Sequence, residues 1–325
     1  MRVLLTGATG YIGSAIAEAL QVAGHHVVGL ARTDSAAQQL HSKGIDVLRG
    51  DVRSPEGWTA AIAGTRSGLE NDRTGNLIEG VIHTAATKDV AMPQTDHLVV
   101  ESILSAMSGT HKPFLYTSGT WILGNVPSLA PNSPTTEDIY PPNPIPLMAW
   151  RVGIEAQVLA AQDQVRSVII RPGMVYGRGG GMVAQLVASG QQTGTVPLVG
   201  TGDNHWALVH VEDLARCYVL ALEQSPAGKI FNAASDSTLT LRDIAHLASK
   251  AAGVPGRVQA QSVEAARQEQ GLLVDGLILD QQLSGFSARQ LLSWCPSAPT
   301  LSEELARGSY TRMVRVPKVE DYNFS

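Results

Sequence analysis

The chain has 325 residues, a formal net charge of −5 and 16% charged residues. This is enough sequence for one large or two modest domains with a proper core. A weakly acidic chain gives no reason to expect nucleic acid or an anionic membrane as a partner, and we expect a small-molecule substrate. No apolar stretch reaches the ~18–20 residues that a membrane span needs. The two cysteines, Cys217 and Cys295, suit a reducing cytoplasm and exclude a disulfide framework.

The N-terminal segment predicts a dinucleotide-binding loop. A short apolar run at 3–5 indicates a buried parallel strand, and TGATGYIG at 6–13 and a helical apolar pattern follow it. Glycines at a strand–helix junction allow a tight turn and close approach of the backbone to a pyrophosphate, while the helix N-terminus offers free N–H groups. The predicted cofactor contacts in this loop are Gly7, Thr9, Gly10, Tyr11, Ile12 and Gly13.

Apolar strand-like runs alternate with helical patterns along most of the chain. After the first run they lie at 26–30, 46–48, 81–83, 114–117, 168–170 and 230–232. Strands separated by helix-length segments imply right-handed crossovers and an α/β fold with a Rossmann-like, doubly wound parallel sheet. The polar stretch 65–76 is predicted to be a surface loop. The proline-rich stretch 128–146 can be neither regular helix nor central strand.

The end of the second predicted strand indicates the cofactor. In this fold an acidic residue there bonds the ribose 2′-hydroxyl of NAD, whereas a basic residue accommodates the 2′-phosphate of NADP. Here Ala31 is followed at once by Arg32, whose planar guanidinium suits a phosphate dianion. The pattern therefore favours NADP over NAD. The alternative rests on Asp34, which would be the ribose ligand if the register were shifted by two residues.

The form TGATGYIG resembles the short-chain dehydrogenase/reductase superfamily, specifically its extended branch of NAD-dependent epimerases, dehydratases and reductases. The resemblance covers nearly the whole chain. It implies a Rossmann domain at 1–172 and 206–234, and a smaller C-terminal substrate-binding lobe at 173–205 and 235–325. It also implies cofactor contacts at the adenine, the nicotinamide ribose and the strand ends. The matching residues are Asp51, Val52, Thr84, Ala85, Ala86, Pro172 and Gly173.

The family's Tyr-x-x-x-Lys pair is absent from this chain. In the family the tyrosine moves the proton at the substrate oxygen, the lysine lowers its pKa and holds the ribose, and a hydroxyl residue orients the carbonyl. Here Leu147 stands at the tyrosine position and Arg151 at the lysine position, or Met148 and Val152 if the register is shifted by one residue. Ser118 or Thr120 could supply the hydroxyl. An arginine can still bind the ribose, but it cannot be deprotonated.

The proton donor must then come from elsewhere. Tyr176, in the segment RPGMVYG at 171–177, is one candidate, although family members with the usual tyrosine share that segment; Lys88 and His205 are others. The predicted catalytic residues are Ser118, Thr120, Arg151 and Tyr176, with Arg151 also a cofactor contact and no metal site.

Together these observations predict an NADPH-dependent reductase of a small or medium-sized, largely apolar carbonyl, imine or activated alkene. A nucleotide-sugar epimerase or dehydratase is the second possibility, although such enzymes keep NAD and use the Tyr-Lys pair. The third is a non-catalytic NADP-binding sensor or scaffold, because fold does not determine function. The resemblance also implies a homodimer that pairs the helices at 98–108 and 150–162.

Overall fold

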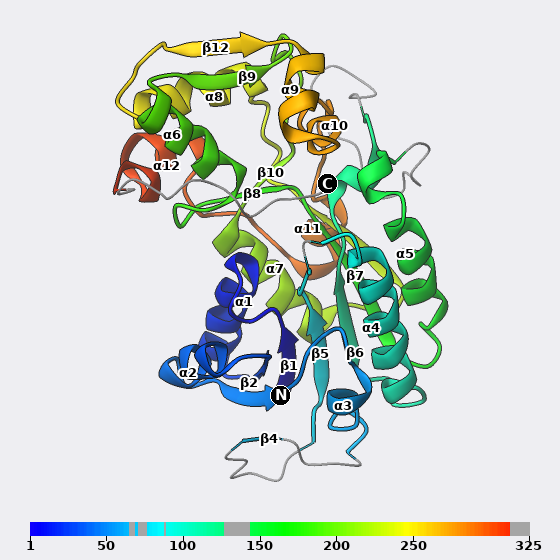
Figure 1. Cartoon of the computed structure of the whole chain (residues 1–325). Coiled ribbons are helices and arrows are strands. Elements are labelled where there is room, and N and C mark those ends of the chain that lie inside the picture. Colours follow the sequence, from blue (N-terminus) through cyan, green and yellow to red (C-terminus); the bar gives the residue numbers. More distant parts are fainter. Residues whose placement is uncertain (65–68, 71–76, 88, 127–143, 313–325) are drawn as a thin grey trace. The chain divides into compact units, whose positions relative to one another are not determined.

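The computed structural model describes residues 1–64, 69–70, 77–87, 89–126 and 144–312. It contains an eight-stranded sheet in the order β11-β7-β6-β5-β1-β2-β3-β4 (Figure 1). The strands are β1 (Arg2–Thr6), β2 (His26–Ala31), β3 (Asp46–Arg49), β4 (Leu69–Glu70), β5 (Gly80–His83), β6 (Pro113–Thr117), β7 (Arg166–Pro172) and β11 (Lys229–Ala233). The parallel pairing of β1, β2, β3, β5, β6 and β7 confirms the predicted Rossmann-like sheet.

One edge of this sheet differs from the prediction. β4 lies inside the stretch 65–76, which was expected to be a loop, and it pairs antiparallel with β3. Its two residues are too few to produce a strand-like sequence pattern. The rest of the stretch lies outside the described residues.

The sheet is covered on both faces, as its continuously apolar strands require. Val3, Leu4 and Leu5 of β1 are fully buried. Helices α1 (Tyr11–Val22) and α2 (Asp34–Ser42) lie on one face, and α4 (Met92–Met107) and α5 (Arg151–Ala160) lie on the other (Figure 1). The short helix α3 (Glu56–Thr59) follows β3, and α7 (Val211–Gln224) precedes β11.

The chain divides into two compact units. The first contains Met1–Ser118, Arg151–Ile170 and Ala215–Ile230, and the second contains Gly119–Trp150, Arg171–Leu214 and Phe231–Ser325. The second unit therefore includes 119–150 and 206–214, which the resemblance had assigned to the Rossmann domain. The reason for 206–214 is visible in the pairing, because β10 (Leu208–His210) pairs in parallel with β8 (Met174–Tyr176) of that same unit.

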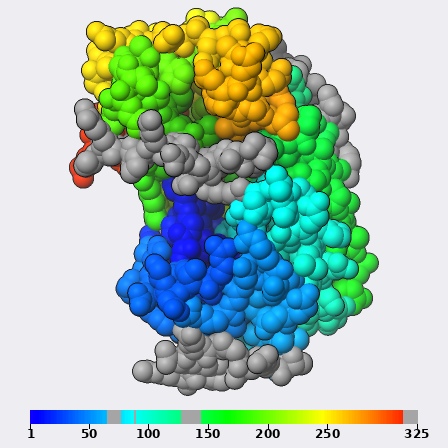
Figure 2. All heavy atoms as spheres, in the orientation of Figure 1, coloured from blue at the N-terminus to red at the C-terminus, as the bar shows by residue number. Residues whose placement is uncertain are grey.

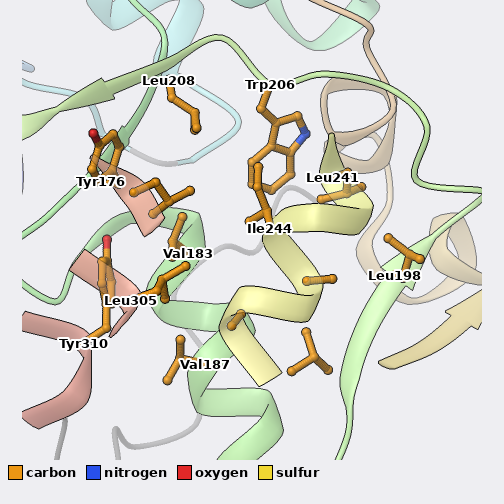
Figure 3. Close-up of a cluster of buried hydrophobic side chains, with 14 of the residues drawn as sticks. Tyr176, Val183, Val187, Leu198, Trp206, Leu208, Leu241, Ile244, Leu305 and Tyr310 are labelled. Carbon is orange, nitrogen blue, oxygen red and sulfur yellow. The ribbon is translucent and has the colours of Figure 1, made fainter. Parts of the chain in front are cut away.

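The second unit is built mainly from helices around its own core. Its remaining elements are η1 (Thr120–Leu123), η2 (Pro146–Met148), α6 (Gly181–Thr193), β9 (Val196–Val199), α8 (Leu241–Ala251), β12 (Val258–Gln261), α9 (Val263–Gln270), α10 (Leu273–Leu277), α11 (Phe286–Leu292), α12 (Leu301–Arg307) and η3 (Ser309–Arg312). Side chains of α6, α8 and α12 pack together with Trp206, Leu208 and Tyr310 in this core (Figure 3). Among the described residues, no helix combines the length and apolar character needed to cross a membrane.

Candidate functional site

The loop between β1 and α1 is shaped for close approach of a ligand to the backbone. Gly7 has a φ of 73°, in the left-handed region that favours glycine. A Cβ atom on Gly13 would lie 2.0 Å from the Gly7 carbonyl oxygen, and one on Gly7 would lie 2.9 Å from the Ala85 nitrogen. Gly10 is the N-cap of α1, so no side chain caps the first-turn N–H groups. These groups can bind a pyrophosphate.

A pocket of about 380 Å³ adjoins this loop within the first unit. It lies where parallel strands end, which is where dinucleotides bind in open α/β sheets. Its lining contains seven of the predicted cofactor contacts together with six further residues. The lining residues are Gly7, Thr9, Leu30, Arg32, Thr33, Ala36, Gly50, Asp51, Val52, Arg53, Ala85, Ala86 and Thr87.

Thr84 and Trp58 support the walls of this pocket. The Thr84 hydroxyl donates to the Thr6 carbonyl oxygen at 2.8 Å, which fixes the turn that carries Ala85. Trp58 Nε1 donates to the Asp51 carbonyl oxygen at 3.0 Å. Gly50 lies against the same indole, where a Cβ atom would come within 2.5 Å of the ring. The residues present therefore fit a dinucleotide.

Two guanidinium groups flank Asp51 in this pocket. Arg32 Nη1 lies 3.8 Å from Asp51 Oδ2, and Arg53 Nη1 lies 3.9 Å from Asp51 Oδ1. Arg53 also donates to Asp89 Oδ2 at 2.5 Å, and the side chain of Arg32 is 59% exposed. Nothing in the sequence singles out Arg53. Its place in the lining of the pocket follows from the position of the loop after β3.

Asp34, the alternative ribose ligand, is engaged elsewhere. It lies in the first turn of α2, where it accepts a hydrogen bond from Arg49 Nη2 at 2.5 Å. Thr33 caps that helix by accepting from the Ala36 N–H. Asp34 does not belong to the lining of the pocket, whereas Arg32 does.

A chain of buried hydrogen bonds links four elements of the first unit to Arg151. Thr6 Oγ1 lies 2.7 Å from His83 Nδ1, and His83 Nε2 lies 2.8 Å from Asp96 Oδ1. The Tyr116 hydroxyl donates to Asp96 Oδ2 at 2.6 Å, and Arg151 Nη1 donates to the Tyr116 oxygen at 3.2 Å. Thr6, His83, Asp96 and Tyr116 are all buried. We call these five residues the Asp96 network.

The ionisation of this network follows from its burial and its charges. Burial alone would lower the pKa of Arg151, but the nearby negative charges of Asp96 and Glu155 raise it above the ordinary value. Burial opposes ionisation of Asp96, yet hydrogen bonds from His83 and Tyr116 and the charge of Arg151 bring its pKa below the ordinary value. Burial raises the pKa of Tyr116 well above its usual range. The network therefore holds a guanidinium, a carboxylate and a neutral phenol.

The other predicted catalytic residues are distributed between the two units. Ser118, in the first unit, is buried, and its hydroxyl has no hydrogen-bond partner among the described residues. A buried hydroxyl without a partner is a candidate contact for a ligand. Thr120, in the second unit, is buried at the start of η1, where its carbonyl oxygen accepts from Gln281 Nε2 at 2.7 Å.

Tyr176 and His205 have structural partners in the second unit. The Tyr176 hydroxyl donates to the Pro299 carbonyl oxygen at 3.0 Å, and burial raises its pKa. Its proton is thus engaged by the backbone, and this geometry does not favour the predicted role in proton transfer. His205 Nδ1 lies 2.8 Å from Asp280 Oδ1. Lys88 lies outside the described residues.

The last predicted cofactor contacts, Pro172 and Gly173, belong to the second unit. Pro172 ends β7, and the Gly173 N–H donates to the Ala233 carbonyl oxygen at 3.0 Å. A Cβ atom on Gly173 would lie 2.4 Å from the Ala207 carbonyl oxygen, so the backbones approach too closely for any other residue.

The second unit also contains an apolar pocket of about 80 Å³. Its lining has no charged side chain, and its two glutamines are its only amide side chains. Trp206 and Leu241 connect it with the core shown in Figure 3. The lining residues are Met182, Gln185, Leu186, Pro197, Val199, Trp206, Leu241, Gln270 and Leu277.

The family of this chain follows from sequence comparison as well as from the fold. The model of the NAD dependent epimerase/dehydratase family matches residues 3–234. The chain therefore belongs to the NAD-dependent epimerase/dehydratase family, which confirms the predicted resemblance.

Three known proteins illustrate the similarity. An uncharacterised protein of Schizosaccharomyces pombe is 32% identical over 316 residues, which cover 95% of this chain and 100% of that protein. The 2-alkyl-3-oxoalkanoate reductase of Stenotrophomonas maltophilia is 27% identical over 278 residues, covering 82% and 80%. The structure of dTDP-glucose 4,6-dehydratase from Bacillus anthracis in complex with NAD superposes with a TM-score of 0.76 at 14% identity, covering 96% of both chains. This last likeness shows the fold alone.

Proposed function

We propose that this protein is an NADPH-dependent reductase of a carbonyl compound, imine or activated alkene with an apolar chain. The observation that carries the cofactor assignment is the place of Arg32 in the lining of the dinucleotide pocket, directly after Ala31. A guanidinium there can bind a 2′-phosphate, and Asp34 is occupied by Arg49. We place the protein in the cytoplasm, because two cysteines in 325 residues suit a reducing compartment.

The residues of the first unit have distinct roles in this proposal. The glycine loop would hold the pyrophosphate, and Asp51 and Val52 would contact the adenine. When bound, the nicotinamide supplies a hydride. Arg151 would hold the ribose or stabilise negative charge that develops on a substrate oxygen, without transferring a proton itself. The proton would come from water, or through the hydroxyl of Ser118 or Thr120.

Two observations support an apolar substrate. The small pocket of the second unit is lined by apolar side chains and by no charged group, which suits a hydrocarbon chain and does not suit a nucleotide diphosphate. In addition, the chain is similar to a reductase whose name specifies an alkyl-branched oxoalkanoate. An epimerase acting on nucleotide sugars is less favoured, because the Tyr-Lys pair is missing.

The experiment compares the affinities of NADPH and NADH by cofactor fluorescence titration. The double change Ala31→Asp with Arg32→Ala should weaken NADPH binding and strengthen NADH binding. A charged hydrogen bond to the phosphate contributes about 1.5–3 kcal/mol, or about 10-fold to 150-fold in affinity. Lys43→Ala is the control, since Lys43 pairs with Glu18 outside the pocket lining and its loss should leave the ratio unchanged. Equal affinities of the unmodified protein for both cofactors would contradict the assignment.

Measurements of turnover distinguish a reductase from a sensor, a scaffold or an epimerase. A panel of 3-oxo esters and ketones with chains of increasing length is offered with NADPH, and oxidation is followed by absorbance. Reduction that improves with chain length supports the proposal. Cofactor binding without turnover of any compound would favour a sensor or scaffold, and tightly held NAD in the purified protein would favour an epimerase.

A further inference from the structure

We propose that Asp96 and Tyr116 are positioning residues that hold the Arg151 guanidinium and join it to the cofactor-binding turn after β5. Their role is to orient the Arg151 cation. They do not replace the proton transfer that the family's tyrosine performs. The proposal rests on the proposed function in one respect, namely that Arg151 contacts the cofactor.

The proton positions in one half of the network follow from counting donors. Thr6 Oγ1 accepts from the N–H groups of Thr84 at 3.2 Å and Ala85 at 3.3 Å. Both lone pairs of this hydroxyl are then used, so its own proton is donated to His83 Nδ1 at 2.7 Å. This pattern places a proton on His83 Nε2, which donates to Asp96 Oδ1 at 2.8 Å. The tautomer is assigned by this hydrogen-bond pattern.

The other half converges on the same carboxylate. Tyr116 donates its only proton to Asp96 Oδ2 and accepts from Arg151 Nη1. The phenol is therefore a bridge between an anion and a cation, and it has no proton left for a substrate. Arg151 is fixed a second time by the Thr117 carbonyl oxygen, which it contacts at 2.7 Å. A buried anion and a cation joined through a shared hydroxyl are stable only when their remaining polar atoms are also satisfied.

Asp96 is thus the shared acceptor of two chains of hydrogen bonds. One chain ends at the Ala85 N–H, in the turn that lines the dinucleotide pocket. The other ends at the Arg151 guanidinium. Because both chains depend on one carboxylate, we infer that the orientation of Arg151 and the shape of the pocket are energetically coupled. Loss of the Tyr116 hydroxyl should therefore matter to the cofactor only while Arg151 is present.

The test is a double-mutant cycle on NADPH affinity, with NADH measured in parallel. Tyr116→Phe, Arg151→Ala and their combination are titrated with cofactor, and a thermal melt verifies that each is folded. Tyr116→Phe should weaken binding about threefold to tenfold in the natural protein and less than about twofold in the Arg151→Ala background. Arg151→Lys should retain part of the sensitivity to Tyr116→Phe, because a lysine keeps the charge but loses the planar fork.

Tyr310→Phe is the matched control. Tyr310 is also fully buried, and its hydroxyl donates to the Gly180 carbonyl oxygen at 2.9 Å within the second unit, outside the Asp96 network. Its removal should cost stability without changing the cofactor affinity more than about twofold, so it reports the effect of losing any buried phenol hydroxyl. An effect of Tyr310→Phe as large as that of Tyr116→Phe would overturn the proposal.

A second variant keeps the test decisive if Tyr116→Phe does not fold. Asp96→Asn places an amide between two donors, so one of its contacts, to His83 or to Tyr116, must be lost. Its effect on affinity should likewise shrink when Arg151 is absent. Additive effects throughout would overturn the positioning role while the reductase assignment stands. Unchanged affinity in Arg151→Ala would overturn both the coupling and the cofactor contact of Arg151, but not the cofactor preference measured at Arg32.

Discussion

At the scale of single residues, the glycine loop has no room for a methyl group at Gly13. In Gly13→Ala the added Cβ would lie 2.0 Å from the Gly7 carbonyl oxygen, so the loop must shift. We expect NADPH binding to fall at least about tenfold, because close backbone approach to the pyrophosphate is lost. Titration with NADPH measures this change.

Gly153→Ala provides the comparison. Gly153 is an exposed residue of α5, and a Cβ there would have no neighbour within 4 Å. Alanine should stabilise the helix by about 0.5–1 kcal/mol and leave NADPH affinity unchanged. If Gly13→Ala bound NADPH as the natural protein does, the loop would not hold the pyrophosphate.

The lowered pKa of Asp96 predicts a specific acid sensitivity. Because the folded-state pKa lies below the ordinary value of 3.8, the carboxylate stabilises the folded protein above about pH 4, and this contribution is lost as the pH falls through the folded-state pKa. Asp96→Asn should be less stable at neutral pH, and its melting temperature should fall less steeply below pH 4. Melting curves between pH 7 and about pH 3 measure this. Parallel curves for the two proteins would contradict the ionised state of Asp96.

The contacts of a residue could be predicted from spacing only where its partners lie close to it in the sequence. The glycine loop is contiguous, so its turn could be predicted from the spacing of its glycines. Thr6, His83, Asp96 and Tyr116 come from separate elements, and their contacts depend on the order of the strands. No spacing in the sequence encodes that order.

At the scale of elements, the capping box of α8 predicts a measurable loss of stability. Thr240 Oγ1 accepts from the Asp243 N–H, and the Asp243 side chain accepts from the Thr240 N–H. Thr240→Ala should lower the free energy of unfolding by about 0.5–2 kcal/mol. α8 carries Leu241 and Ile244 into the core of the second unit, so fraying of its first turn would reach that core (Figure 3).

Urea unfolding measures this change, and Thr240→Ser is the control because it retains the hydroxyl. Equal stabilities of the serine and alanine variants would show that the cap contributes nothing.

Seven of the eight strands of the large sheet were predicted to within two residues, because each is a continuous apolar run, whereas β4, β8, β9, β10 and β12 were not predicted. The predicted helix 150–162 corresponds to α5, which begins at Arg151 and ends at Ala160, and Leu147 lies before it in the 3₁₀ helix η2. A cation in the first turn opposes the helix dipole. The negative charge of Asp96 offsets this penalty.

At the scale of the whole molecule, we propose a homodimer that uses α4 and α5. Both helices bury one face on the sheet, through Val99 and Ile103 on α4 and Val158 on α5. On the outer side of α4, Leu98 is 36% exposed beside Glu101. The cyan surface in Figure 2 shows this part of the chain exposed to solvent.

Light scattering measures the mass in solution. We expect about twice the chain mass of 34.4 kDa at micromolar concentration, and a shift toward the single-chain mass for Leu98→Asp. His97→Asp is the control. It adds a negative charge at the exposed neighbouring residue without removing an apolar side chain. A single-chain mass for the unmodified protein would exclude the dimer at that concentration.

The interruption between η2 and α5 limits how this chain could return to the chemistry typical of its family. A tyrosine and a lysine four residues apart meet because a continuous helix places them on one face. The double change Leu147→Tyr with Arg151→Lys would restore the two residue types of the motif. It would not place them on one face of α5, since Leu147 precedes that helix. Restoring the geometry of the pair would therefore require α5 to begin at least one turn earlier, in addition to the two side-chain changes.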